Sequence, residues 1–239
     1  MTKTIDIKGA VYDNDTAAFY SFFGMKVVSP SAVDEVLSDG TTDDVTVNVA
    51  SNGGDVFAAS EIYSMLKAYK GKVEVNIQGL AASAASVIAM AGDKVSIAPT
   101  AQIMIHKAWS GMQGNADDLA HESGVLSKID DSIAAAYEAK TGMNQGDLLN
   151  LMSNETWMGA QEAVDKGFAD EIMFVNDDTP QVVNSGSPML PKSAVNKLLN
   201  LINKADRPKP QEPQQNKPKN SQPTDSLKSR KLAILMGKN

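Results

Sequence analysis

The alternation of strand-like and helix-like segments constrains the fold of this chain more than any other feature. Apolar residues at every second position mark strands, and capped segments with one apolar face mark the helices between them. The expected strands cover 4–10, 44–49 and 72–77, and the expected helices run from Ser29 to just before Gly40 and over 56–69. Strands joined through helices lie parallel, with right-handed crossovers, so the pattern predicts an α/β fold with a largely parallel sheet.

The same alternation continues through the second half of the chain. The further expected elements are strands at 94–98, 101–105 and 171–175 and helices at 115–140, 144–151 and 160–166. A loop or turn-rich segment is expected over 13–24. In parallel sheets ligands bind at the carboxyl ends of the strands, so the residues that follow strands are candidates for a site.

One such candidate is the stretch 79–92, which follows the strand over 72–77. It is built almost wholly of small residues, and the sequence predicts a strand, a sharp turn and a buried helix. Ser83 stands at the expected helix start, where unpaired N–H groups could stabilise an oxyanion. Taken alone, Ser83 is more typical of a helix cap than of a nucleophile, and Ser86 is more typical of a packing residue.

The chain has two histidines, and they occupy different kinds of position. His121 lies in the polar opening of the long helix, which favours a solvated surface role. His106 directly follows an apolar strand. A lone histidine there is more often structural, but beside a serine at a helix start it becomes the credible general base. With no cysteine and no His-Glu-x-x-His pattern, we expect no metal site.

The glycine pair Gly53-Gly54 follows the expected strand over 44–49 and precedes a helix. Paired glycines permit positive φ and leave N–H groups uncovered, as an anion site requires. An ordinary strand-to-helix turn is the simpler interpretation. A phosphate-binding loop is disfavoured because no Gly-Lys-Ser/Thr follows.

Composition divides the chain near residue 175. The formal net charge is −7. Residues 1–175 are acidic, whereas 176–239 are basic, lack aromatic residues and hold most of the prolines. We therefore predict a globular domain over 1–175 and a mostly disordered tail over 176–239, with a short amphipathic helix near 193–202. The acidic body argues against nucleic-acid binding, and the absence of a signal-like or membrane-spanning apolar run favours a soluble, cytoplasmic protein.

Several motifs occur together in an order that identifies a family. They are Ser51-Asn52-Gly53-Gly54, Gly79-Leu80-Ala81-Ala82-Ser83, Met104-Ile105-His106, 109–118, Glu155-Thr156-Trp157 and 161–170. Across residues 4–175 the sequence resembles the Clp protease proteolytic subunit, and more closely the similar phage head-maturation (prohead) proteases. The resemblance implies a Clp/crotonase-like fold of repeated β-β-α units with a mostly parallel sheet.

The resemblance also implies a serine endopeptidase mechanism. Ser83 would be the nucleophile, His106 the general base and Glu155 the residue that orients His106, with Asn154 an adjacent competitor. The N–H groups of Gly53 or Gly54, together with that of Ala84, would bind the oxyanion. The sequence departs from the family pattern at Asn52, where proline is common, and at Glu155, where the Clp subunit has aspartate.

Partners follow from the same resemblance. A substrate strand would bind along 108–114, at Trp109, Ser110 and Gly111. The chain would form a homo-oligomeric ring, a heptamer or stacked rings, without a cofactor. As a prohead protease it would cleave capsid or scaffold protein in the host cytoplasm, either without ATP or with an ATPase partner. The alternatives are a weakly active or inactive assembly factor and a crotonase-like acyl-CoA enzyme; a Ser–Lys pair through Lys107 is disfavoured because Lys107 should point to the opposite face.

Overall fold

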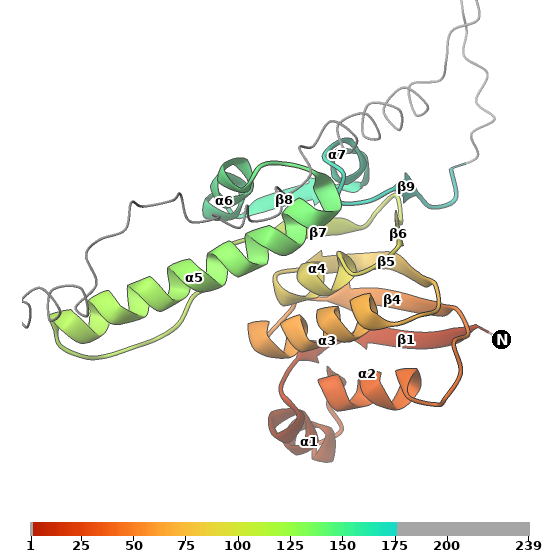
Figure 1. Cartoon of the computed structure of the whole chain (residues 1–239), viewed down its shortest axis with the longest axis horizontal. Coiled ribbons are helices and arrows are strands. Elements are labelled where there is room, and N and C mark those ends of the chain that lie inside the picture. The colour runs from red at the N-terminus through yellow and green to blue at the C-terminus, as the bar shows by residue number, and fades with distance from the viewer. Residues whose placement is uncertain (1, 176–239) are drawn as a thin grey trace, which may run out of the picture. The chain divides into compact units, whose positions relative to one another are not determined.

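The computed structural model describes residues 2–175, which form alternating strands and helices (Figure 1). The predicted tail and its helix near 193–202 lie outside the described residues. The helices are α1 Asn14–Phe22, α2 Pro30–Leu37, α3 Val56–Ala68, α4 Ala84–Ala89, α5 Ala116–Thr141, α6 Gln145–Ser153 and α7 Ala160–Asp165. The strands are β1 Lys3–Lys8, β2 Ala10–Val11, β3 Val27–Val28, β4 Val45–Ser51, β5 Val73–Ala82, β6 Lys94–Ile97, β7 Gln102–Ile105, β8 Thr156–Gly159 and β9 Glu171–Ile172.

The main sheet confirms the predicted α/β class. Its strands β1-β4-β5-β6-β9 are all parallel, and β7 joins the end of β5 in parallel register. The exception is β8, which pairs antiparallel with β7. Helices α2, α3 and α4 lie together on one face of β1, β4 and β5 (Figure 1).

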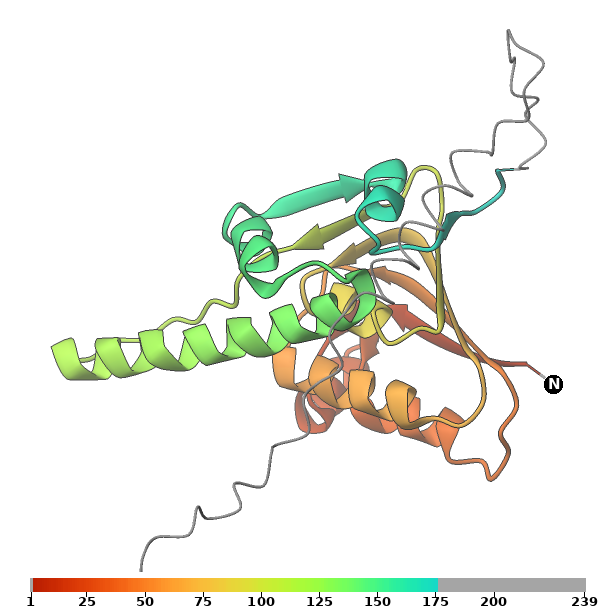
Figure 2. The ribbon, with the colours of Figure 1, turned by 45° about the horizontal axis from the view of Figure 1, so that its top comes forward.

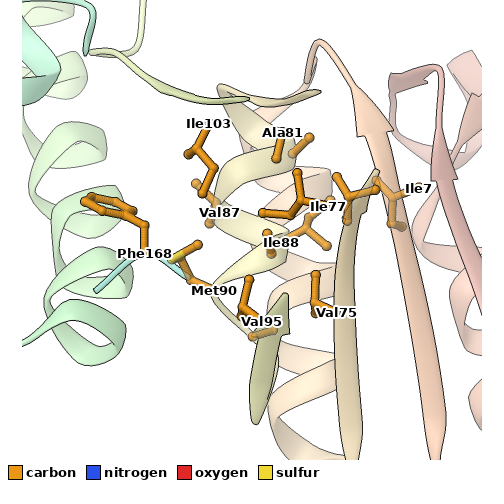
Figure 3. Close-up of a cluster of buried hydrophobic side chains, with 14 of the residues drawn as sticks. Ile7, Val75, Ile77, Ala81, Val87, Ile88, Met90, Val95, Ile103 and Phe168 are labelled. Atoms are coloured by element: carbon orange, nitrogen blue, oxygen red, sulfur yellow. The ribbon is translucent and has the colours of Figure 1, made fainter. Parts of the chain in front are cut away.

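The core forms where the sheet meets α4. Alternate residues of β4 and β5 point into it; Val47, Val75 and Ile77 have no exposed surface. All six residues of α4 are buried, because the helix lies between the sheet and the other helices. Figure 3 shows Val87 and Ile88 of this helix, and Met90 directly after it, packed among side chains of the strands. The small residues predicted to let this helix approach the sheet therefore do so.

Strand β5 is longer than the expected strand over 72–77. The strand continues to Ala82, so the sharp turn is confined to Ser83. The extension arises because β5 changes partners: its first half pairs with β6, and Leu80 to Ala82 pair with β7. The last strand, β9, is shorter than the predicted 171–175.

Helix α1 corrects the loop predicted over 13–24. Asp13 caps it by accepting hydrogen bonds from the N–H groups of Asp15 and Thr16. Phe19, Phe22 and Phe23 stay exposed and contact one another edge to face instead of forming a buried stripe, so the periodic signal of a core helix is missing. Over residues 2–175, no helix combines the length and the apolar character that crossing a membrane requires.

Candidate active site

Ser83 occupies a strained turn between β5 and α4. Its backbone has φ 54° and ψ −126°, a conformation that costs a non-glycine residue about 1–3 kcal/mol. The turn is held on both sides, because the Ser83 N–H donates to the Met104 carbonyl (2.9 Å) and the Ser83 carbonyl accepts from the Ser86 N–H (2.9 Å). Ser83 occupies the N-cap position of α4, but its side chain makes no capping hydrogen bond to the helix.

His106 reaches Ser83 from the end of β7. Ala82 pairs with Met104, so the ends of β5 and β7 lie side by side. His106 follows Met104 by two residues, and residues two apart along an extended chain point to the same face. The His106 Nε2 atom lies 2.7 Å from the Ser83 Oγ atom, within hydrogen-bond distance. Two residues that the sequence singled out for separate reasons thus meet at the carboxyl edge of the sheet.

The glycine loop after β4 lies directly against this turn. A Cβ atom built on Gly53 would come within 2.6 Å of the Ala82 carbonyl oxygen, 2.8 Å of the Ala84 nitrogen and 2.9 Å of the Ser83 Cβ. A Cβ atom built on Gly54 would lie 2.1 Å from the Val11 carbonyl oxygen. Both glycines have positive φ, so both positions need glycine for backbone conformation and for space.

The two glycines differ as donors to an oxyanion. The Gly53 N–H already donates to the Ser51 hydroxyl (3.0 Å), whose own proton goes to the Gly9 carbonyl. This hydrogen bond removes Gly53 from the predicted donors. Among the described residues no hydrogen bond involves the N–H of Gly54 or of Ala84, the first residue of α4. These two amides remain candidates for an oxyanion site.

Glu155 lies in the turn just before β8, and among the described residues no hydrogen bond joins its carboxylate to His106. The antiparallel β7–β8 ladder ends with Ile105 opposite Thr156, so His106 and Glu155 each lie one residue beyond its last pair. The Glu155 carboxylate instead accepts a hydrogen bond from the Trp157 indole N–H at 3.2 Å, and Glu155 has φ 46°. The predicted third residue therefore directs its side chain toward Trp157 in this structure. Asn154 is an exposed residue at the end of α6.

The segment predicted to receive substrate is open. Trp109 is 80% exposed, and Gly111 has open space where a side chain would stand. The Ser110 hydroxyl donates to the Glu122 carboxylate. His121 is exposed on α5, as predicted for a surface residue. No group of metal-binding side chains suited to hold an ion occurs within residues 2–175.

A mostly apolar cavity of about 510 Å³ lies between α3, α4 and α5, and its lining also includes Lys128 and the hydroxyl-bearing residues Ser60, Ser64 and Ser132. Val87, one turn after Ser83, and Val56, two residues after Gly54, form part of its wall. Ile129, Ile133 and Phe57 line it from the flanking helices. Periodicity could identify these residues as apolar but not as a cavity wall, because the gap depends on how α3 and α5 are spaced.

Sequence reasoning also missed three buried polar residues near the site. They are Ser86, Asp130 and Tyr137, all under 7% exposed. Ser86 was expected only to pack, and the two α5 residues attracted no prediction. A signal was available in the sequence, since Asp130 interrupts an apolar helix face that continues through Ile133 and Tyr137.

A strained serine at a helix start, within hydrogen-bond distance of a histidine that follows the adjacent strand and near the amides of Gly54 and Ala84, is an arrangement typical of serine hydrolase sites. The family profile described as Clp protease matches residues 35–176. The chain therefore belongs to the Clp protease family.

Individual relatives agree with the family match. The chain is 30% identical over 138 residues to the ATP-dependent Clp protease proteolytic subunit of Deinococcus radiodurans, which covers 57% of this chain and 68% of that protein. It is also 30% identical over 133 residues to the subunit of the same name from Bacteroides fragilis, covering 55% and 64%. For Porphyromonas gingivalis the match is 30% over 135 residues, covering 56% and 61%. The chain thus matches only about two thirds of the length of these relatives.

Proposed function

We propose that this chain is a serine endopeptidase in which Ser83 is the nucleophile and His106 the general base. The observation that carries the proposal is the 2.7 Å contact between the Ser83 Oγ and His106 Nε2 atoms. Support comes from the strained turn, because its conformation presents the hydroxyl to His106 rather than to the amides of α4. Membership of the Clp protease family supports the same chemistry.

The reaction proceeds in two halves. Ser83 Oγ attacks the peptide carbonyl carbon while its proton passes to His106 Nε2, and the carbonyl oxygen becomes an oxyanion. His106 returns the proton to the departing amine as the C–N bond breaks, leaving an ester on Ser83. Water then attacks the ester carbon while His106 takes its proton, the bond to Ser83 Oγ breaks to release the acid, and His106 returns the proton to Ser83 Oγ. The N–H groups of Gly54 and Ala84 stabilise the oxyanion in both halves, aided by the positive end of α4.

Glu155 completes the arrangement through a change of side-chain conformation. Glu155 and His106 each lie one residue beyond the last pair of the β7–β8 ladder, and rotation of the Glu155 side chain away from Trp157 is the movement that would direct the carboxylate to the imidazole. In that position it stabilises the imidazolium that forms during attack. The present contact with Trp157 is also the observation that favours the second candidate, a weakly active or inactive assembly factor. Activity of the Glu155→Gln variant separates the two.

The substrate is an extended polypeptide. Backbone groups of 109–111 offer it a strand-like partner beside the glycine loop, a common mode of peptide recognition. The cavity next to Val87 and Val56 receives an apolar side chain of the substrate near the cleaved bond. Peptides with leucine or methionine before the cleaved bond are therefore the preferred substrates.

The biological role that we propose is cleavage of capsid or scaffold protein by a ring-shaped prohead protease in the host cytoplasm. It rests on the resemblance of the motifs to phage head-maturation proteases. The exposed N-terminal half of α5, which extends past the sheet in Figure 2, supplies a surface for contacts between subunits. Light scattering that gives the mass of a monomer contradicts the ring, and cleavage with and without an added ATPase tests the need for a partner.

The experiment that tests the proposed chemistry compares the wild-type chain with Ser83→Ala on casein and on a fluorogenic leucine peptide. Alanine has the same Cβ as serine, so the turn keeps its conformation and circular dichroism should not change. We expect cleavage to disappear. Unchanged cleavage by Ser83→Ala would overturn the assignment of the nucleophile.

A further inference from the structure

A buried chain of hydroxyl groups connects α5 with the turn at Ser83. The Ser86 hydroxyl donates to the Ser83 carbonyl at 2.6 Å, and the Tyr137 hydroxyl lies 2.8 Å from the Ser86 oxygen. A serine hydroxyl has one proton, and that of Ser86 is used by Ser83, so Tyr137 must be the donor to Ser86. Ser86 has no exposed surface and Tyr137 is 1% exposed, so water does not compete for these bonds.

Tyr137 is suited to act as a hydrogen-bond donor. Burial raises the pKa of its phenol well above the usual range, so the hydroxyl keeps its proton. Its ring packs against Phe168, 5.5 Å away between centroids, which fixes the position of the hydroxyl. The chain of bonds therefore starts from a rigid point.

A second buried contact connects α5 with the segment that follows His106. The Asp130 carboxylate accepts a hydrogen bond from the Ala108 N–H at 2.8 Å. Asp130 is 6% exposed, and Ala108 is two residues beyond His106. The chain leaves β7 at Ile105 without further regular structure, so this bond anchors the exit of the strand that carries the imidazole.

Both contacts come from one face of one helix. Asp130 and Tyr137 are seven residues apart, or about two helical turns, and the buried Ile133 and Ala134 lie between them on that face. Ser83 and His106, by contrast, belong to segments more than twenty residues apart in sequence. Helix α5 is thus a common support for the two partners of the 2.7 Å contact.

We propose that Asp130 and Tyr137 are positioning residues for the hydrolysis. Tyr137 acts through Ser86 on the carbonyl of Ser83, and Asp130 acts through the Ala108 amide on His106. This inference rests on the proposed serine endopeptidase function. It explains why polar side chains are buried on a helix face that packing alone would fill with apolar residues.

Ser86 and Tyr137 permit a test that separates positioning from stability. Ser86→Ala leaves the buried Tyr137 hydroxyl without an acceptor, which should lower Tm by about 3–10 °C. The double variant Ser86→Ala/Tyr137→Phe removes both hydroxyls, and the Ser83 carbonyl keeps its bond from the Ser86 N–H, so Tm should return close to that of the wild type. If the hydroxyls only stabilise the fold, activity should return with Tm.

The proposal gives a different expectation for activity. In the double variant kcat on the leucine peptide should stay about tenfold lower with KM within twofold, because small displacements of a nucleophile cost rate rather than binding. The rate of labelling of Ser83 by a fluorophosphonate should fall by the same factor. Ser96→Ala is the matched control: Ser96 is a buried serine on β6 that donates to Glu171, and its loss should leave kcat unchanged.

Asp130 is tested by comparing asparagine with alanine. Asp130→Asn keeps an oxygen acceptor for the Ala108 N–H and should retain kcat within about threefold, whereas Asp130→Ala should lose about tenfold. Equal kcat in wild type, the Ser86/Tyr137 double variant and Asp130→Ala overturns this inference while leaving the endopeptidase intact. A wild-type chain that neither cleaves peptide nor labels at Ser83 overturns the proposed function, and this inference with it.

Discussion

Replacing Gly53 by alanine perturbs the site at the point where the glycine loop touches the nucleophile turn. Gly53 has φ 92°, a conformation that costs an L-residue about 1–2 kcal/mol. The new methyl group would also lie 2.6 Å from the Ala82 oxygen and 2.8 Å from the Ala84 nitrogen, both backbone atoms that cannot rotate away. Overpacking of this kind costs about 1–3 kcal/mol. The two effects together predict a loss of about 2–5 kcal/mol in the free energy of unfolding.

Gly24→Ala is the control that measures the cost of positive φ without a steric clash. Gly24 has φ 74°, but a Cβ there would meet nothing within 4 Å. Its expected cost is therefore only about 1–2 kcal/mol, with no change in activity. Urea unfolding followed by circular dichroism gives the free energies, and the leucine peptide gives kcat.

The activity of Gly53→Ala should fall more steeply than its stability predicts. The clash pushes on the residues that carry Ser83 and the Ala84 amide, and a shift of about 1 Å at such a site can cost up to 100-fold in rate. If Gly53→Ala is no less stable than Gly24→Ala and cleaves as fast as the wild type, the close approach of the glycine loop to the turn is not a feature of the working protein.

Four further predictions follow from the described residues. Phe168→Ala should lower the free energy of unfolding by about 3–5 kcal/mol in urea titrations, because the ring is fully buried. Asn115→Ala should cost about 1 kcal/mol in the same assay, because it removes the side chain that caps α5. Glu155→Gln should lower kcat at least 100-fold whereas Asn154→Ala should leave it within twofold; equal effects would contradict the choice of Glu155. In peptide cleavage assays, leucine should exceed aspartate before the cleaved bond by at least tenfold in kcat/KM, since the cavity near Val87 is mostly apolar.

Much of the fold could be predicted because its signals are local. Alternating apolar residues gave the strands of the parallel sheet, and capping residues such as Ser29 and Asn115 gave the starts of α2 and α5. Elements whose stability depends on distant partners were missed. Strand β8 has four residues and exists through its pairing with β7. Helix α1 was missed because its aromatic residues are exposed, which removes the periodicity that identifies a core helix.

Some features of the candidate site could likewise be predicted from local sequence, and others could not. Ser83 and His106 could be chosen from their places after strands, and the structure brings them into contact. Which glycine amide stays available could not be predicted, because it depends on the Ser51 hydroxyl turning to Gly53. The side-chain direction of Glu155 and the contacts of Asp130 and Tyr137 likewise depend on tertiary packing that no spacing in the sequence encodes.

Labelling with a fluorophosphonate probe, followed by mass spectrometry of the modified peptide, tests the central claim most directly. An activated serine attacks the probe in one step, without the need for a known protein substrate. We predict a single adduct on Ser83, absent from Ser83→Ala and strongly slowed in His106→Ala. A chain that remains unmodified, or an adduct that forms equally well without the imidazole of His106, would contradict it.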